Sequence, residues 1–410
     1  MAVVYLDTET GRRTSFLVQA TYREGQALKQ FEARWVPSLR MWRLPTSVNL
    51  VELTNKLPAL ILSDEVAAWL ADELARQTHL RALHQADDAV ITYPNGLDPY
   101  QRVGVRFLAD AGRAILADDV GLGKTVQAIR AAMEVDSQRV LIVTKKTLIH
   151  NWVRAVQRWA GRDAFTLATQ NTLPYPPPHF VVANYETVVR RLEELKACFF
   201  DTLIVDEAAA IKNRKAQRSK AIHSLAKTTD FVWLLTASPM PNSPDEIWSL
   251  LHCIRPDKYP SYWQFVSRHL EYERNYFGGV KILGVKNEKS LVTELAPLML
   301  RRDKSILNLP PITHEVIWLQ MDGEQYRIYN ELRKHFIAVL DEERVVTAPT
   351  VLAQLTRLRQ VTCTPALIGG PDCSAKTETL IELLEELTPH HKVLVFTTFA
   401  EYVDLLLPGL

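Results

Sequence analysis

A short glycine-containing segment carries the clearest chemical signal in the sequence. It follows an apolar run, opens a helical pattern and reads Gly121-Leu122-Gly123-Lys124-Thr125. Glycines at these positions let backbone N–H groups approach phosphate oxygens, and a helix N-terminus adds partial positive charge. Lys124 can reach the β- and γ-phosphates of a nucleotide, and the Thr125 hydroxyl can ligate Mg²⁺. The segment predicts a phosphate loop, although Asp118 stands where the strict pattern has glycine.

A pair of carboxylates provides the second chemical signal. Asp206 and Glu207 follow the apolar run Leu203–Val205. Open α/β sheets bind their ligands at the carboxyl ends of the strands, so both carboxylates are expected beside the phosphate loop. In this arrangement Asp206 holds Mg²⁺, and Glu207 orients or activates the water that attacks the γ-phosphate. We therefore expect Lys124, Asp206 and Glu207 to be the catalytic residues, with Thr125 and Asp206 at the metal.

Short apolar runs alternate with helical patterns after residue 97, and these elements must position the two motifs. The runs are Ala114–Leu116, Val140–Val143, Phe180–Ala183, Leu203–Val205 and Val232–Leu235. Each is continuously apolar, as parallel strands buried on both faces are, and strands interleaved with helices indicate an open α/β sheet. From Pro244 to about Gly370 the pattern is mostly helical. An amphipathic stretch at Lys376–Leu387 and a further strand at Val393–Phe396 follow.

The first 90 or so residues have a different pattern, which predicts a small α+β module. Val3–Leu6 and Phe16–Ala20 favour a hairpin around Gly11, and Ser63 is a suitable N-cap for a helix that reaches Leu83. Asp7-Thr8-Glu9 resembles the metal-binding start of a proofreading exonuclease. Further Asp and His ligands at a suitable spacing are missing, because His84 and Asp87 do not fit, so we reject an exonuclease site.

Composition excludes several classes of protein. The 410 residues are 47% hydrophobic and 23% charged, with 48 basic against 47 acidic side chains, so a disordered chain and a histone-like polycation are both excluded. Cys198, Cys253, Cys363 and Cys373 lack zinc-site spacing and are expected to be reduced thiols. Neither a signal peptide nor a membrane span is evident, so we expect an intracellular, soluble protein without a membrane partner.

Several segments in chain order resemble the motor of the Swi/Snf-type ATPases, a family of helicase superfamily two. The resemblance covers roughly three quarters of the chain. Besides the phosphate loop and the Asp206–Ala209 segment, the similar segments are Leu97–Leu108, Val140–Thr144 with Leu148–Trp152, Ala183–Thr187, Leu234–Asn242 with Asp245–Leu251, Leu298–Lys304, Leu355–Gln360 and Lys392–Phe399. The resemblance implies a RecA-like parallel-sheet lobe, a helical insertion and the start of a second RecA-like lobe.

Nucleotide and DNA contacts are also implied by the resemblance. Gln101 would read the adenine edge of ATP, while Asp118, Gly121, Leu122 and Gly123 would line its phosphates beside Mg²⁺. Duplex or forked DNA would be contacted through its backbone by Lys145, Lys146, Asn184 and Tyr185. Lys212 and Arg214 open a basic run that continues through Lys215, Arg218 and Lys220 without an acid. This run is either a further backbone contact or a solvated surface.

The sequence departs from the family pattern in the Asp206–Ala209 segment, which resembles motif II, and in the Leu234–Asn242 segment, which resembles motif III. Ala209 replaces a polar residue that would couple the γ-phosphate site to motif III, and Ala237 and Ser238 replace Gly-Thr. Phe31–Pro45 faintly resembles the HARP-like, DNA-binding module of the annealing-helicase branch. The alternative is that its two tryptophans simply pack a small β-domain.

The resemblance implies four regions and an incomplete motor. We expect an accessory module at 1–92, the first RecA-like lobe at 93–250, a helical protrusion at 251–370 and the beginning of the second lobe at 371–410. Motifs V and VI, which supply arginines to the ATP site, would follow Phe399. We therefore expect a truncated motor that binds ATP but hydrolyses it poorly without a complementing chain. The alternatives are a non-hydrolysing ATP- and DNA-binding module and another superfamily-two motor, such as a restriction-enzyme subunit.

Overall fold

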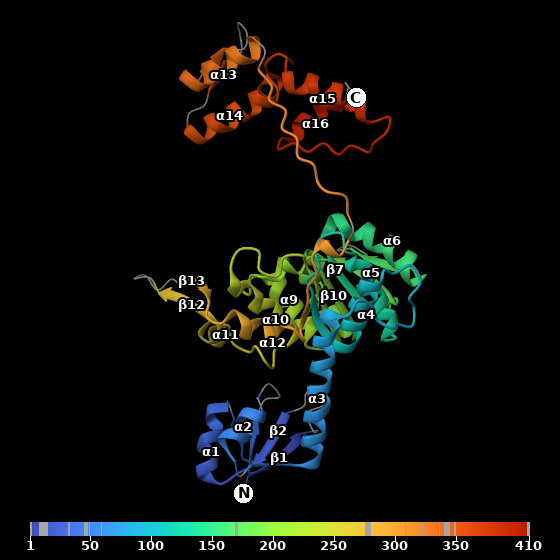
Figure 1. The fold of residues 1–410 in the computed structure, drawn as a ribbon, viewed down its shortest axis with the longest axis vertical. Coiled ribbons are helices and arrows are strands. Elements are labelled where there is room, and N and C mark those ends of the chain that lie inside the picture. The colour runs from blue at the N-terminus through green and yellow to red at the C-terminus, as the bar shows by residue number, and fades with distance from the viewer. Residues whose placement is uncertain are drawn as a thin grey trace. The chain divides into compact units, whose positions relative to one another are not determined.

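The computed structural model describes residues 2–7, 15–31, 33–44, 48, 50–58, 60–168, 171–274, 280–307, 309–321, 323–335, 337–339, 345–347 and 350–407. The chain forms two compact units, residues 1–309 and residues 310–410, which are described separately (Figure 1). The expected region boundaries near residues 92, 250 and 370 stay predictions.

A small mixed sheet forms the N-terminal part of unit 1. Its strands lie in the order β3-β4-β2-β1-β5, and only the β1–β5 pair is parallel. The elements are β1 (Ala2–Asp7), β2 (Ser15–Gln19), α1 (Tyr22–Leu28), β3 (Arg34–Val36), β4 (Met41–Leu44), α2 (Leu50–Lys56), β5 (Leu60–Leu62) and α3 (Asp64–Ala82). The predicted hairpin is confirmed, while Gly11 in its turn lies outside the described residues.

Side chains of this sheet include Asp7, from the rejected exonuclease pattern, and the two tryptophans of the 31–45 segment. Asp7 is buried and pairs with Arg43, whose Nε lies 2.9 Å from Oδ2, so this carboxylate has a structural partner. Thr8 and Glu9, the rest of the rejected exonuclease pattern, lie outside the described residues. Trp35 and Trp42 meet edge to face at 5.4 Å, and Trp42 is buried while Trp35 is half-exposed.

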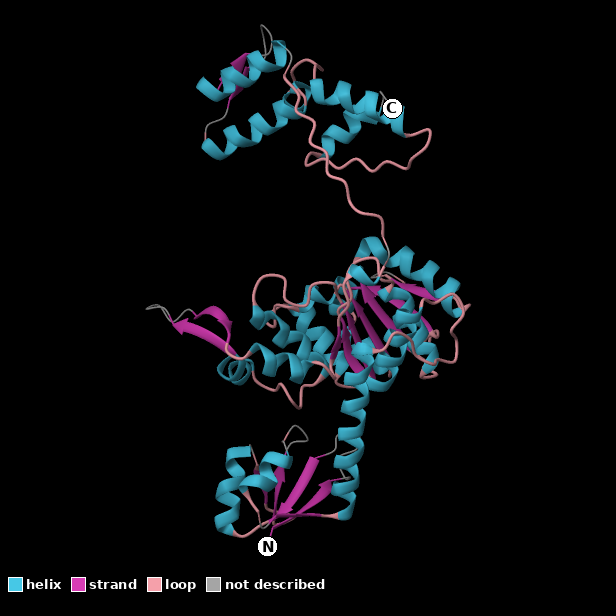
Figure 2. Cartoon of the chain, in the orientation of Figure 1, coloured by secondary structure: helices cyan, strands magenta, loops and turns pink. Residues whose placement is uncertain are grey.

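A large parallel sheet lies at the centre of the rest of unit 1, with helices around it (Figure 2). Among the described residues it contains seven strands in the order β14-β6-β11-β10-β7-β9-β8. These are β6 (Arg113–Leu116), β7 (Val140–Thr144), β8 (Ala164–Leu167), β9 (Phe180–Asn184), β10 (Thr202–Asp206), β11 (Phe231–Leu235) and β14 (Met299–Leu300). The five predicted strands are confirmed, whereas β8 and β14 were not predicted.

Both faces of this sheet are covered by helices, which explains the continuous apolar runs. Along β10, Leu203 and Val205 pack on one face and Ile204 packs on the other. Residues of α4 (Pro99–Ala111), α5 (Lys124–Glu134) and α6 (Ile149–Ala160) cover the face of Ile204. The opposite face is covered by α7 (Tyr185–Arg190), α8 (Leu192–Ala197), α9 (Gln217–Ala226), α10 (Ile247–Ile254), α11 (Tyr262–His269) and α12 (Glu288–Leu295).

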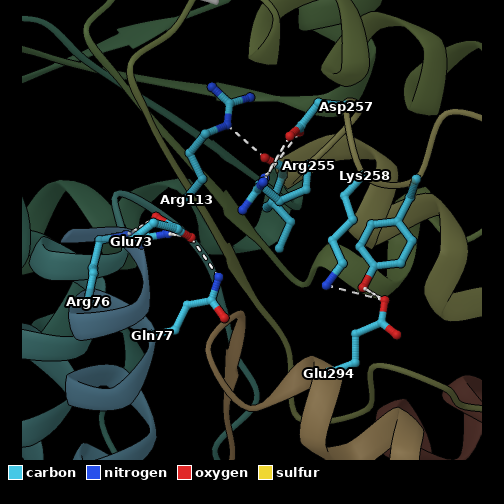
Figure 3. Close-up of polar contacts among 10 residues, drawn as sticks. Glu73, Arg76, Gln77, Arg113, Arg255, Asp257, Lys258 and Glu294 are labelled. Carbon is cyan, nitrogen blue, oxygen red and sulfur yellow. Dashed lines mark hydrogen bonds and ion pairs between the residues drawn. The ribbon is translucent and has the colours of Figure 1, made fainter. Parts of the chain in front are cut away.

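The described residues between 244 and 309 are less helical than the sequence pattern predicts. A hairpin of β12 (Leu270–Arg274) and β13 (Val280–Val285) interrupts the helices, and β14 joins the edge of the large sheet. Two side chains hold α12: Lys258 Nζ lies 3.3 Å from Glu294 Oε1 (Figure 3). Tyr259 donates to the same oxygen at 2.9 Å. These contacts anchor the helix that leads into β14.

Unit 2 is mainly helical. It contains α13 (Gly323–His335), β15 (Ile337–Val339), β16 (Val345–Thr347), α14 (Val351–Cys363), α15 (Ala375–Leu387) and α16 (Ala400–Leu406). The amphipathic helix predicted at 376–387 is confirmed as α15, but the strand predicted at 393–396 is wrong. These residues are irregular, and Leu394 and Phe396 are 81% and 89% exposed. An apolar run becomes a strand only by pairing, and no described strand pairs with this one.

The described residues hold no helix that is both long and apolar enough to span a membrane. Within the described part of the chain the four cysteines form no disulfide: Cys198 and Cys253 are buried, and Cys363 and Cys373 are partly buried.

A largely buried histidine makes the fold sensitive to acid. His223 of α9 contacts the Ser249 carbonyl oxygen of α10 through Nε2 at 3.0 Å. Burial, reinforced by His252, lowers its pKa from 6.5 to about 4. Between pH 6.5 and about pH 4, His223 therefore binds a proton in the unfolded chain but stays neutral in the folded chain. Because of this histidine, we expect the free energy of unfolding to decrease by about 2 kcal/mol when the pH is lowered from 7.5 to 5.

Urea titrations at the two pH values test this expectation. H223Q should show a smaller loss of stability on acidification than the wild type, whereas the exposed control H314Q should lose as much as the wild type. Equal pH dependence in H223Q and the wild type would contradict the assignment.

Candidate functional site

The predicted phosphate loop lies between β6 and α5, at the carboxyl end of a central strand. β6 ends at Leu116 and α5 begins at Lys124, so residues 117–123 turn between a buried strand and a helix N-terminus. Gly121 and Gly123 have φ angles of 92° and 75°, which favour glycine. A Cβ at Gly123 would also lie 2.5 Å from Gln101 Nε2. The geometry explains why this loop requires glycine beside the helix.

The Lys124 ammonium is held at the phosphate loop. Its Nζ donates to the carbonyl oxygens of Asp118 and Asp119 at 2.7 and 3.1 Å. Burial lowers the pKa of Lys124, and the negative charges of Asp118, Glu207, Asp206 and Asp119 oppose this shift. Lys124 therefore lies close enough to Asp206 and Glu207 for their negative charges to stabilise its ammonium. The two motifs are nevertheless about 80 residues apart in the chain.

Asp206 is oriented by side chains from neighbouring elements. It ends β10, and its Oδ2 accepts hydrogen bonds from Thr144 Oγ1 and Trp152 Nε1, both at 2.8 Å. Its Oδ1 accepts from the backbone N–H of Glu207 at 3.0 Å. These three donors fix the orientation of the carboxylate, and carboxylate oxygens are ligands that Mg²⁺ and Ca²⁺ accept.

Glu207 adopts a left-handed backbone conformation with a φ angle of 51°, which is uncommon for a residue with a side chain. Its side chain is 45% exposed, and Oε2 lies 3.8 Å from Lys145 Nζ. The turn after β10 therefore carries a carboxylate side chain that solvent reaches. Such strain is common at functional sites.

The residues present fit Mg²⁺ bound together with a nucleotide. The described residues contain no cluster of three His, Cys, Asp or Glu side chains that could hold a metal ion by itself. Mg²⁺ is commonly held by one or two carboxylates together with substrate phosphates, so it does not need such a cluster. Thr125 in the first turn of α5 and Asp206 at the end of β10 would provide the oxygen ligands for this mode.

Two predicted nucleotide residues make their contacts within the protein. Gln101 Oε1 accepts from the Asp98 backbone N–H at 3.1 Å, and its Nε2 donates to the Leu122 carbonyl oxygen at 3.4 Å. Reading an adenine edge would require these bonds to be exchanged, so that role stays a prediction. The Asp118 carboxylate is fully buried and pairs with Arg302, so its side chain does not line the phosphate site as we expected.

The predicted DNA-binding residues after β7 and β9 divide into two groups. Lys145 and Lys146 are exposed, as a contact with a DNA backbone requires. Asn184 caps α7 by accepting from the Thr187 N–H at 2.8 Å. The prediction for Tyr185 is wrong: this side chain is 4% exposed, and its hydroxyl donates to the Asp206 carbonyl oxygen at 2.5 Å. Tyr185 supports the strand end that carries Asp206.

The basic run after β10 is partly occupied by contacts within the chain. Lys212 pairs with Glu246 at 2.9 Å, and the Arg214 guanidinium lies 4.2 Å from the centre of the Tyr262 ring. The exposed members of the run are Lys215, Arg218 and Lys220. Both interpretations of this segment therefore stay open.

Sequence reasoning assigned no role to four residues that support the site. Thr144 and Trp152 orient Asp206, and Arg302 and Gln127 bind Asp118 and the phosphate loop. Gln127 lies in the same helix as Lys124, but Thr144 and Trp152 are more than 50 positions from Asp206 and Arg302 is 184 positions from Asp118, so spacing could not reveal these three. One feature of the sequence could have pointed to Gln127 and Arg302. It is Gly104 inside α4, because a glycine in a helix often marks a place where other side chains approach closely.

Curated relatives match most of this chain. It is 26% identical over 369 residues to chromodomain-helicase-DNA-binding protein 6 of Homo sapiens, covering 76% of this chain and 13% of that protein. It is 28% identical over 356 residues to the ISWI chromatin-remodeling complex ATPase ISW1 of Saccharomyces cerevisiae, covering 77% of this chain and 30% of that protein. The chain thus spans less than a third of the length of either relative.

Among solved structures, a Sulfolobus solfataricus SWI2/SNF2 ATPase core in complex with dsDNA is 22% identical, with a TM-score of 0.47 and coverage of 77% of this chain and 69% of that chain. The family comparison is the informative one. It confirms the resemblance to Swi/Snf-type ATPases that the sequence motifs indicated. Because the SNF2-related domain matches residues 100–367, well over half of the sequence, the chain belongs to the SNF2-related domain family.

Proposed function

We propose that this chain is an ATP-dependent DNA motor that binds Mg·ATP at the phosphate loop, with hydrolysis that depends on a completed second lobe. The observation that carries this proposal is the meeting of two motifs at the carboxyl edge of one parallel sheet. Lys124 opens α5 beside β6, and the charges of Asp206 and Glu207 at the end of β10 act on its ammonium. Membership of the SNF2-related domain family supports the same function.

The reaction would be an in-line attack of water on the γ-phosphate. The water oxygen forms a new P–O bond, the bond from the γ-phosphorus to the β,γ-bridging oxygen breaks, and ADP, phosphate and a proton are released. Glu207 would orient the water and accept its proton, while Lys124 would neutralise charge on the β- and γ-phosphates. Mg²⁺, which enters with ATP, would neutralise further phosphate charge beside Thr125 and Asp206.

DNA is the polymer that we propose the motor binds. Lys145 and Lys146 are exposed at the carboxyl edge of the sheet, and Lys145 lies 3.8 Å from Glu207. A contact between Lys145 and a phosphate of the DNA backbone would therefore lie next to the residue proposed to orient water. The human relative is named as a DNA-binding protein, and this supports DNA as the partner of this chain. Backbone contacts would not depend on base sequence, as tracking along DNA requires.

The proposed function is tested by measuring phosphate release with and without duplex DNA. We expect a duplex to raise the rate of release. We also expect the stimulation to disappear between about 50 and about 200 mM salt, because phosphate contacts release counterions. A forked substrate in parallel shows which DNA structure stimulates more. Normal ATP binding without stimulation by either DNA would contradict the motor and favour a non-hydrolysing ATP- and DNA-binding module.

A further inference from the structure

Residues 298–302 run beside β6 and continue its ladder of hydrogen bonds into the phosphate loop. The N–H groups of Ile115, Ala117 and Asp119 donate to the carbonyl oxygens of Leu298, Leu300 and Arg302 at 2.8, 2.7 and 2.9 Å. The last of these bonds joins residue 302 to the backbone of the loop itself. A segment almost 200 residues further along the chain thus contacts the backbone of the predicted phosphate loop directly.

The Arg302 side chain continues this contact beneath the loop. Its Nε and Nη2 donate to the two carboxylate oxygens of Asp118 at 3.0 and 2.5 Å. Nη2 also donates to Gln127 Oε1 at 2.8 Å, and Nη1 donates to the Tyr100 carbonyl oxygen. Its guanidinium further lies 5.4 Å from the centre of the Tyr100 ring. All of these partners belong to the phosphate loop or to the helices beside it.

A second layer of bonds connects Arg302 to the part of the loop that faces phosphate. Gln127 Nε2 donates to the Leu122 carbonyl oxygen at 3.0 Å, between the two loop glycines. Gln127 is fully buried, and Gly104 leaves room for it, because a Cβ there would lie 1.7 Å from Gln127 Oε1 and 2.8 Å from Arg302 Nη2. The position of Leu122 therefore depends on Gln127, which Arg302 orients.

The charge of Asp118 makes this arrangement sensitive to Arg302. The carboxylate is fully buried, and its described hydrogen-bond donors are Arg302 and Gln127. A buried carboxylate that loses its guanidinium partner must find another donor, take up a proton or move toward water. Each of these changes would displace the Asp118 backbone, whose carbonyl oxygen holds the Lys124 ammonium.

We infer that Arg302 is a positioning residue for the nucleotide site and couples the phosphate loop to the segment through which the chain leaves unit 1. Residues 303–309 follow Arg302 directly and end unit 1. The Lys304 N–H donates to Asp119 Oδ2 at 3.3 Å, so this segment also contacts the loop. Coupling is reciprocal: nucleotide in the loop would restrain residues 303–307, and a displacement of these residues would change nucleotide affinity. This inference rests on the proposed binding of ATP at the phosphate loop.

Calorimetric titration with Mg·ADP tests the positioning role. R302K keeps a positive charge but cannot bind both oxygens of Asp118 and Gln127 together, and we expect it to raise the dissociation constant about tenfold. D118N changes the charge of residue 118 but hardly its size, and it should weaken Mg·ADP binding as well. It replaces R302K as the test variant if R302K folds poorly. The matched control is R301A, since Arg301 is an exposed neighbour of the same charge, and it should bind Mg·ADP like the wild type.

Amide hydrogen exchange with and without Mg·ADP tests the coupling. In the wild type and R301A we expect slower exchange at residues 303–307 when Mg·ADP is bound, and this protection should be lost in R302K at saturating nucleotide. Unchanged affinity in R302K and D118N, with only a lower melting temperature, would show a purely structural ion pair and overturn the inference. Absence of protection in the wild type would refute the coupling. If the wild type does not bind Mg·ADP, the proposed function itself fails.

Discussion

Replacing Lys124 with alanine is expected to weaken Mg·ATP binding by about 100-fold. The ammonium is the cation that the structure holds over the phosphate loop, and charge-assisted hydrogen bonds to phosphate contribute roughly 1.5–3 kcal/mol each. Alanine is compatible with the first turn of α5, so the fold of unit 1 should survive. Calorimetric titration of the wild type and K124A with Mg·ATP measures the effect.

The control for this substitution is K289A, which removes an exposed lysine from α12. Its Mg·ATP affinity and melting temperature should equal those of the wild type. Wild-type affinity in K124A would remove the assignment of residues 117–125 as a phosphate loop.

Replacing Glu207 with glutamine is expected to leave Mg·ATP binding within about threefold of the wild type and to lower the turnover rate at least 100-fold. Glutamine keeps the size of the side chain but cannot accept the proton of the attacking water, and a positioned general base contributes roughly 10²–10⁴-fold. Loss of the negative charge also frees Lys145, which lies 3.8 Å from Glu207 Oε2. Affinity and single-turnover hydrolysis, measured on the same preparation, separate binding from chemistry.

E193Q is the matched control, because Glu193 is exposed on α8 and pairs with Lys196 at 2.8 Å. It should alter neither affinity nor turnover. If E207Q hydrolyses ATP at the wild-type rate, another group must orient the water, and the assignment of Glu207 would be wrong.

Local patterns predicted the elements that carry the chemistry. Apolar runs bounded by turns located the five central strands of the large sheet, because strands buried on both faces require apolar side chains at consecutive positions. Capping also acts locally: Ser63 begins α3 and Ser374 begins α15, each by accepting a hydrogen bond from an N–H three residues on. The phosphate loop was visible for the same reason, because its glycines, lysine and helix start are adjacent in the chain.

Patterns could not predict the strands that depend on distant partners. β14 contains two residues and exists because β6 presents a free edge to it. The run at 393–396 has the composition of a strand, yet it pairs with no described strand and stays irregular. Side-chain roles show the same limit: Tyr185, interpreted as a DNA contact, lies in the core with its hydroxyl on the Asp206 carbonyl oxygen.

The sequence by itself indicated the family and the parallel sheet and predicted Lys124, Asp206 and Glu207 as site residues, because the motifs that carry these predictions consist of neighbouring positions. The tertiary structure alone decided which groups hold these residues in place. Thr144 and Trp152 orient Asp206, and Arg302 binds Asp118 beneath the phosphate loop. A buried carboxylate needs a charged or hydrogen-bonding partner, and the fold decides which residue supplies it. Only the folded chain brings residues 118 and 302 together.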